Sequence, residues 1–109
     1  MMTKTMFFCE ITKVYSKIEN VKKILNTDEY HLISNYVDIG RKSEVLDSVV
    51  EGLSYEIANK LFWSNDNEKI YDTTRYNIKT LLSKSCCDWL VINETIKLLE
   101  ELGVEFKED

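Results

Sequence analysis

The sequence predicts an all-α protein, a compact bundle of five to six short helices that forms a single helical domain over residues 1–109. Pro is absent and Gly occurs only three times, and these are the residues that turns and long loops require. Apolar residues recur at steps of three and four, the spacing of one helix face. With 44% hydrophobic and 30% charged residues, the chain can bury a core without a metal or a disulfide.

The first segment, residues 4–25, has two interpretations. Its apolar residues recur at helical spacing, but the same stretch is rich in the β-branched and aromatic residues that favour strands. The alternative is an α+β fold, in which a small strand at 5–14 precedes a helix at 17–26 and pairs near the C-terminus with residues 104–106. The positions that support a helix include Phe7, Ile11, Val14 and Ile18.

A second helix is expected between Thr27 and Gly40. The hydroxyl of Thr27 can cap the first turn, and the acidic residues Asp28 and Glu29 follow it at the positive end of the helix dipole. Gly40 can adopt the left-handed conformation that ends many helices.

Residues 43–63 form the longest segment with a clear helical period. Ser43 can cap its start, and we expect its core face to be centred near Leu53. The apolar residues assigned to that face are Leu46, Val49, Val50, Leu53, Ile57 and Leu61.

The C-terminal third predicts a loop and two further helices. Residues 64–72 are polar and predict a loop, and Thr73 or the residue before it can cap the next helix. Ser85 is expected to start the last helix, and Gly103 to end it. Because residues 89–92 are apolar on nearly all sides, we expect the last helix to be central and buried.

The net charge of −5 is distributed unevenly. Residues 1–27 carry five Lys against two acids, residues 28–69 carry nine acids against four bases, and residues 70–109 carry eight acids against five bases. Duplex nucleic acid repels such a surface, so a basic protein is the more natural partner. The simpler alternative is that the negative charge only keeps the chain soluble. No stretch is long enough to span a membrane, and the chain is expected to be cytoplasmic.

No set of residues predicts catalysis or metal binding, so we expect neither an enzyme nor a cofactor. Three cysteines, two of them adjacent, make a poor disulfide framework. Cys86 and Cys87 lie at a predicted helix start, where the dipole can lower the pKa of a thiol, but no His is near in sequence and His31 stands alone. The acidic stretch that begins at Asp66 lacks the Gly and Glu that a calcium-binding EF-hand loop requires.

One face of the 43–63 helix predicts a recognition surface. Opposite its core face the residues begin acidic and end aromatic, and the acidic loop follows. Aromatic side chains anchor protein partners, and acids select basic ones and speed their encounter. The alternative is that this face packs under another helix. The residues predicted to bind a partner are Glu44, Asp47, Glu51, Tyr55, Phe62, Asp66, Glu68, Tyr71 and Asp72.

These features predict a small acidic binding protein that neutralises a basic partner by covering its active site. Immunity proteins against nuclease toxins, antitoxins and phage-encoded nuclease inhibitors are proteins of this type. The alternative is a structural or adaptor subunit of a larger assembly, which would bury a more apolar face.

Overall fold

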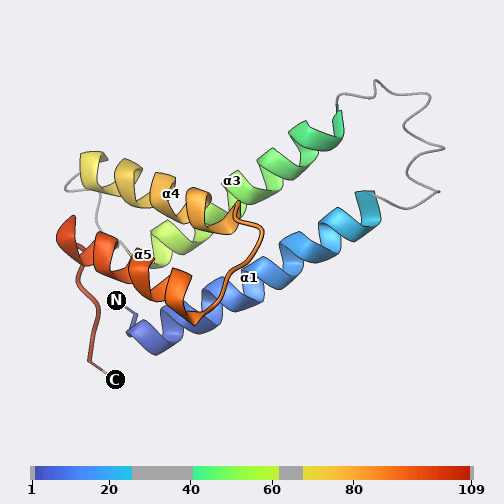
Figure 1. The fold of residues 1–109 in the computed structure, drawn as a ribbon. Coiled ribbons are helices and arrows are strands. Elements are labelled where there is room, and N and C mark those ends of the chain that lie inside the picture. The colour runs from blue at the N-terminus through green and yellow to red at the C-terminus, as the bar shows by residue number, and fades with distance from the viewer. Residues whose placement is uncertain (1, 26–40, 62–67, 109) are drawn as a thin grey trace.

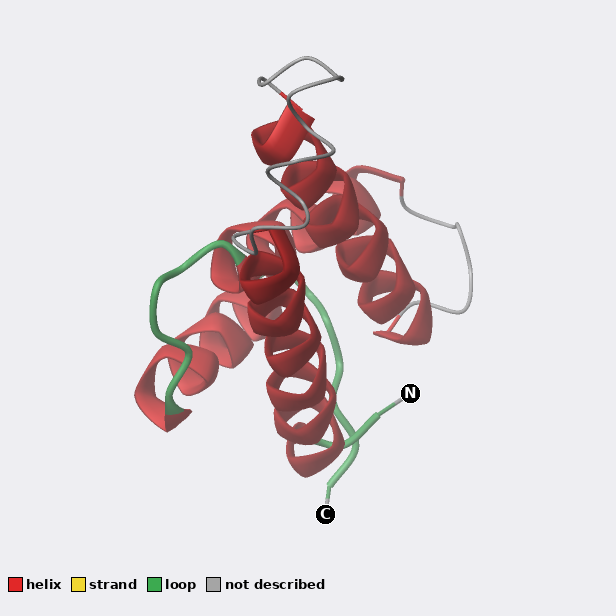
Figure 2. Cartoon of the chain, turned by 90° about the vertical axis from the view of Figure 1, so that its right-hand side faces the viewer, coloured by secondary structure: helices red, strands yellow, loops and turns green. Residues whose placement is uncertain are grey.

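The computed structural model describes residues 2–25, 41–61 and 68–108. These ranges hold four helices, namely α1 (Lys4–Leu25), α3 (Arg41–Leu61), α4 (Glu68–Leu82) and α5 (Trp89–Glu101) (Figure 1). Within the same ranges no strand forms, and the segment between α4 and α5 consists of turn and loop residues (Figure 2). The all-α prediction is confirmed, but the described chain has four helices rather than five or six. The helix predicted from Thr27 to Gly40 lies outside the described residues.

Helix α1 is unbroken, so the α+β alternative is wrong. The hydroxyl oxygen of Thr3 accepts a hydrogen bond from the Met6 amide at 3.0 Å and caps the first turn. The apolar residues at helical spacing form one buried face. The C-terminal tail does return to the N-terminus, but only through one parallel β-bridge between Thr3 and Lys107, beside an edge contact between Phe7 and Phe106 with centroids 5.5 Å apart.

Two predicted helix starts are displaced. Helix α3 begins at Arg41, two residues before the expected cap Ser43. Helix α4 begins at Glu68, so the loop predicted at 64–72 is too long. The ring of Tyr71 packs partly against the core, and this burial extends the apolar face of α4 by one turn before the predicted cap.

Helix α5 starts and ends on specific caps. Asp88, and not Ser85, is the N-cap, because its carboxylate accepts a hydrogen bond from the Val91 amide at 3.0 Å. Gly103 follows the helix with φ of 101°, and the Val104 amide donates to the Leu99 carbonyl at 2.9 Å. The predicted stop at Gly103 is confirmed, since only Gly adopts such a φ without strain.

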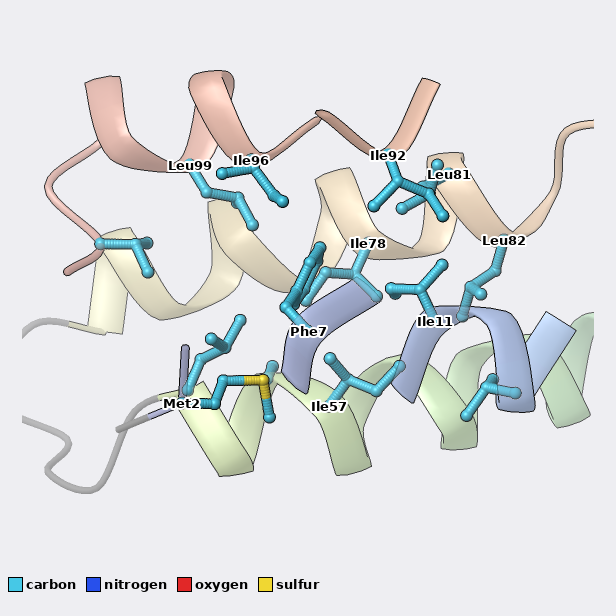
Figure 3. Packing of buried hydrophobic residues seen from close by; sticks show 14 of the residues in the cluster. Met2, Phe7, Ile11, Ile57, Ile78, Leu81, Leu82, Ile92, Ile96 and Leu99 are labelled. Carbon is cyan, nitrogen blue, oxygen red and sulfur yellow. The ribbon is translucent and has the colours of Figure 1, made fainter. Parts of the chain in front are cut away.

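The four helices share one hydrophobic core (Figure 3). Helix α1 contacts the other three, while α3 packs on α4 and α4 packs on α5. The C-terminal part of α1 and the N-terminal part of α3 both extend past α4 and α5 (Figure 1). The largest fully buried side chains include Phe7, Ile11, Ile18, Ile57, Ile78, Leu81, Leu82, Ile92, Ile96 and Leu99.

The core face of α3 is rotated from its predicted centre. Leu53 is only half-buried, whereas Ala58, which is not among the residues predicted for the core face, is completely buried. Helix α3 is covered by α1 on one side and by α4 on the other, so its buried arc is shifted toward α4. The residues buried on α3 are Val50, Ser54, Ile57, Ala58 and Leu61.

Helix α5 lies at the edge of the bundle, so the expectation that its first turn is central and buried is wrong. Trp89 is 54% exposed and Leu90 is 68% exposed. Among the described helices, α1 and α4 pack against it. The indole of Trp89 meets the ring of Phe8 edge-on, with centroids 5.2 Å apart.

Candidate functional site

The structure brings several of the predicted partner-binding residues together. Glu44, Asp47, Glu51 and Tyr55 follow one another at steps of three and four along α3, so one edge of that helix carries them. Tyr71 and Asp72 lie on α4 rather than in a loop, and Glu68 is the first residue of that helix. Phe62 and Asp66 lie outside the described residues.

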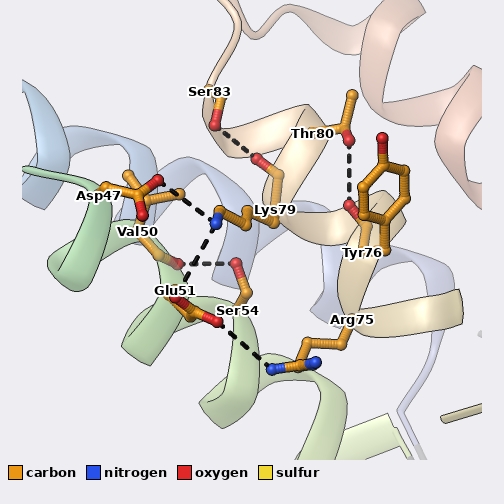
Figure 4. A network of polar contacts seen from close by, with 9 residues as sticks. All are labelled: Asp47, Val50, Glu51, Ser54, Arg75, Tyr76, Lys79, Thr80 and Ser83. Atoms are coloured by element: carbon orange, nitrogen blue, oxygen red, sulfur yellow. Dashed lines mark hydrogen bonds and ion pairs between the residues drawn. The ribbon is translucent and has the colours of Figure 1, made fainter. Parts of the chain in front are cut away.

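Helices α3 and α4 run antiparallel, and this sets the predicted residues of α3 opposite polar residues of α4. Contacts pair residue 47 with 79, 51 with 75, and 59 with 71. We call the contact line the polar seam, part of which Figure 4 shows. Its members are Asp47, Glu51, Tyr55 and Asn59 of α3, with Tyr71, Asp72, Arg75, Tyr76 and Lys79 of α4.

Two cations of α4 pair with the carboxylates of the seam. The Lys79 ammonium lies 3.3 Å from an oxygen of Asp47 and 3.8 Å from one of Glu51 (Figure 4). The Arg75 guanidinium reaches Glu51 at 3.6 Å and Asp72 at 4.0 Å. Part of the acidic surface is therefore neutralised within the chain, and each half-exposed pair adds little stability by itself.

Aromatic rings complete the seam. The guanidinium carbon of Arg75 lies 4.2 Å from the centroid of the Tyr55 ring, a cation–π distance. Tyr71 lies beside Tyr55, with ring centroids 6.4 Å apart, and its hydroxyl donates a hydrogen bond to the Asn59 side-chain oxygen at 2.7 Å. Tyr76 points away from this cluster and is 69% exposed.

The seam keeps acidic character after these pairs form. Its three carboxylates, Asp47, Glu51 and Asp72, face two cations, which leaves a charge of −1. Exposed Glu44 adds another negative charge, and the Asp72 side chain is 67% exposed. A basic surface that approaches the molecule can therefore reach carboxylates that are already held in place.

A small cavity of about 120 Å³ opens on the seam between Glu51 and Ser54 of α3 and Arg75, Tyr76 and Lys79 of α4. The Ser54 hydroxyl donates to the Val50 carbonyl at 2.7 Å. The Nε–H of Arg75 is buried without a hydrogen-bond acceptor among the described residues. These groups can bind polar or charged partners, but they do not form a pair of nucleophile and base.

Sequence reasoning missed Arg75 and Lys79. Their spacing of four residues on one helix matches the spacing of Asp47 and Glu51 on the other, and this match was the available signal. It becomes meaningful only when α3 and α4 are known to be antiparallel neighbours.

The cysteine pair precedes α5 instead of lying in its first turn. Cys86 is exposed and Cys87 is half-buried. Burial raises the pKa of the Cys87 thiol, the neighbouring Cys86 and Asp88 raise it further, and Lys84 opposes them. A lowering of the thiol pKa by the helix dipole, which the sequence allowed, is therefore not found at Cys87. Across the described ranges, no three His, Cys, Asp or Glu residues are grouped to hold a metal ion, and His31 lies outside these ranges.

A hydrogen bond ties the segment before α5 to α1. The Tyr15 hydroxyl donates to the Lys84 carbonyl at 2.9 Å. Burial raises the pKa of Tyr15, and the charge of Glu19 raises it further, so this hydroxyl keeps its proton at neutral pH.

A second exposed surface lies at the start of α5. It consists of Phe8, Trp89 and Leu90, which we call the apolar patch. Exposed Trp and Leu side chains beside one another are typical of protein contact sites.

The polar seam and the apolar patch are the two surfaces on which we base a functional hypothesis. No helix in the described part of the chain combines the length and apolar character needed to cross a membrane. Comparisons of the chain with protein-family models, curated proteins and solved structures find no match.

Proposed function

We propose that this chain is a small protein-binding inhibitor that neutralises a basic partner, such as a nuclease toxin, by covering its active site. Immunity proteins, antitoxins and phage-encoded nuclease inhibitors act in this general way. The observation that carries the proposal is that exposed Asp72 and the carboxylate Glu51 of α3 share the partner Arg75 on one pair of packed helices.

The physical basis is charge and shape complementarity. A nuclease holds substrate phosphates with Lys and Arg side chains, and carboxylates can occupy the same positions. Such an inhibitor only has to exclude the substrate, so no chemistry by this chain is required.

The internal ion pairs of the seam support this role. Arg75 and Lys79 hold Glu51 and Asp47 on the surface of a helix pair. A partner then meets carboxylates whose side-chain motion is already restricted, which lowers the entropy lost on binding. The remaining negative charge steers a basic partner toward the seam.

The test needs the partner, captured with the tagged chain from the native host and then purified. Association and dissociation rates are measured for the wild type and for Asp47→Lys and Asp72→Lys. Glu94→Lys, an exposed position on α5 with the same charge change, is the matched control. We expect the two seam variants to associate at least several-fold more slowly and with a weaker salt dependence, because charges at an interface rim act mainly on association.

Circular dichroism must show that the variants remain folded. If the seam variants and Glu94→Lys change the association rate equally, the effect comes from net charge and the seam is not the binding site.

The apolar patch favours a second candidate, a subunit of a larger assembly. Trp89 and Leu90 are more than half exposed, and burial of such residues drives the association of stable subunits. In that case Leu90→Ser should weaken the complex, the seam variants should not, and the association rate should change little with salt.

A further inference from the structure

We infer that Asp72 and Tyr76 form a site for an arginine guanidinium group of the partner protein. This inference rests on the proposed function and names the cation that the seam selects.

The seam already holds one guanidinium, that of Arg75. It lies over the Tyr55 ring at 4.2 Å and against a Glu51 oxygen at 3.6 Å. Glu51 and Tyr55 are four residues apart on α3, so a carboxylate and a ring lie next to each other on the helix surface. In this structure the pair holds the guanidinium of Arg75.

Asp72 and Tyr76 repeat the same pair on α4. They are also four residues apart, again with the carboxylate before the tyrosine, so the two side chains share one face of the helix. The two pairs differ in whether a cation of the chain lies on the tyrosine ring. Tyr76 is 69% exposed, with no ring or cation contact among the described residues, and Asp72 touches Arg75 only at 4.0 Å.

The surroundings of this second pair suit a cation from outside. Tyr76 lines the small cavity together with Glu51 and Lys79. The contact of Lys79 with Glu51, at 3.8 Å, is longer than its contact with Asp47, at 3.3 Å. Lys79 therefore holds both of these carboxylates of α3, and the Tyr76 ring points away from them (Figure 4), so Asp72 is the carboxylate that this pair offers to a cation from outside.

A guanidinium fits this pair better than an ammonium. It is planar, it stacks on aromatic faces, and it is more weakly hydrated than the ammonium group of lysine. Within the described residues the ammonium of Lys79 pairs with carboxylates alone, while the guanidinium of Arg75 also uses a ring.

The experiment compares an oligoarginine peptide with an oligolysine peptide of the same length. Each is titrated into the full-length protein, and binding is followed by the amide chemical shifts of the seam residues. We expect the arginine peptide to bind about two- to fivefold more tightly, the factor that an exposed cation–π contact supplies. The largest shifts should centre on Asp72 and Tyr76.

Two substitutions at an exposed position separate the ring from the hydroxyl group. Tyr76→Leu should abolish the preference for arginine, and Tyr76→Phe should keep it, because the aromatic face remains. An unchanged far-ultraviolet circular dichroism spectrum shows that both variants are folded.

One outcome would contradict this inference alone, and another would contradict the proposed function as well. If both peptides bind equally tightly, and Asp72→Asn weakens both, the seam recognises basic partners without selecting arginine and the inference is wrong. If neither Asp72→Asn nor Asp47→Asn changes the binding of either peptide, the inference and the proposed role of the seam both fail.

Discussion

Arg75 shows how much one residue can organise on the surface of a small helical protein. Its guanidinium touches Glu51, Asp72 and the ring of Tyr55, and its side chain is only 25% exposed. The pair of Lys4 with Glu100 at 3.3 Å is a contrast, since both side chains are more exposed and each pairs once. Exposed single pairs contribute little, so we attribute the order of the seam to Arg75 and Lys79, each of which pairs with two carboxylates.

The alkylation rate of Cys87 shows whether its thiol is unusually reactive. We expect the rate of alkylation by iodoacetamide to reach half its maximum at a higher pH in the folded protein than in the urea-unfolded chain. Burial raises the pKa of Cys87, so less thiolate is present at any pH below that pKa. The measurement uses the Cys9→Ser and Cys86→Ser double variant, in which Cys87 is the remaining cysteine.

The direction of the Cys87 pKa shift also predicts how the stability of the fold depends on pH. A thiol whose pKa is raised by folding stabilises the native state below its unfolded pKa, about 8.5, and that contribution is lost as the pH rises through the folded pKa. An alkylation midpoint lower in the folded protein than in the unfolded chain would contradict the prediction and support a nucleophilic role.

At the scale of the helix, the neighbours of an element decide which of its faces is buried. Helix α3 is covered on two sides, and this buries Ser54 and Ala58 completely. In α5 the face toward α1 and α4 is buried, whereas Trp89 and Leu90 are more than half exposed although they start an apolar run. Periodicity located both helices, but it did not set their rotation.

Replacement of glycine by alanine should have opposite effects on stability at Gly52 and at Gly103. A Cβ atom at Gly52 would meet nothing within 4 Å, so Gly52→Ala should stabilise the protein by about 0.5–1 kcal/mol through the greater helix propensity of Ala. Gly103 has a φ of 101°, and Gly103→Ala should destabilise by about 1 kcal/mol or more, because Ala is strained there. Urea unfolding of both variants measures the two changes.

A glycine inside a helix can allow a neighbouring backbone to approach closely, and among the described residues no such approach is found at Gly52. A loss of stability in Gly52→Ala would show that a close approach exists there after all.

At the scale of the whole molecule, one core joins the four described helices, and α5 supplies a direct test of where that core ends. Ile96 is fully buried and Leu98, two residues later, is half exposed. Ile96→Ala should lower the free energy of unfolding by about 2–5 kcal/mol. Leu98→Ala removes the same number of carbon atoms and should cost about 1 kcal/mol or less.

Thermal or urea unfolding followed by circular dichroism compares these two variants with the wild type. Equal losses would mean that the outer side of α5 is covered in solution, as the subunit alternative requires.

The sequence by itself determined the helical class, because scarce Gly, absent Pro and a period of three to four residues are local properties. It also located the stop at Gly103 and the acidic and aromatic residues of α3. Only the tertiary structure decided that Ala58 is buried, that Trp89 is exposed and that Arg75 and Lys79 lie against Glu51 and Asp47. The physical reason is that burial and ion pairing depend on which helices are neighbours and in which direction they run, and neither is encoded in the period of a single helix.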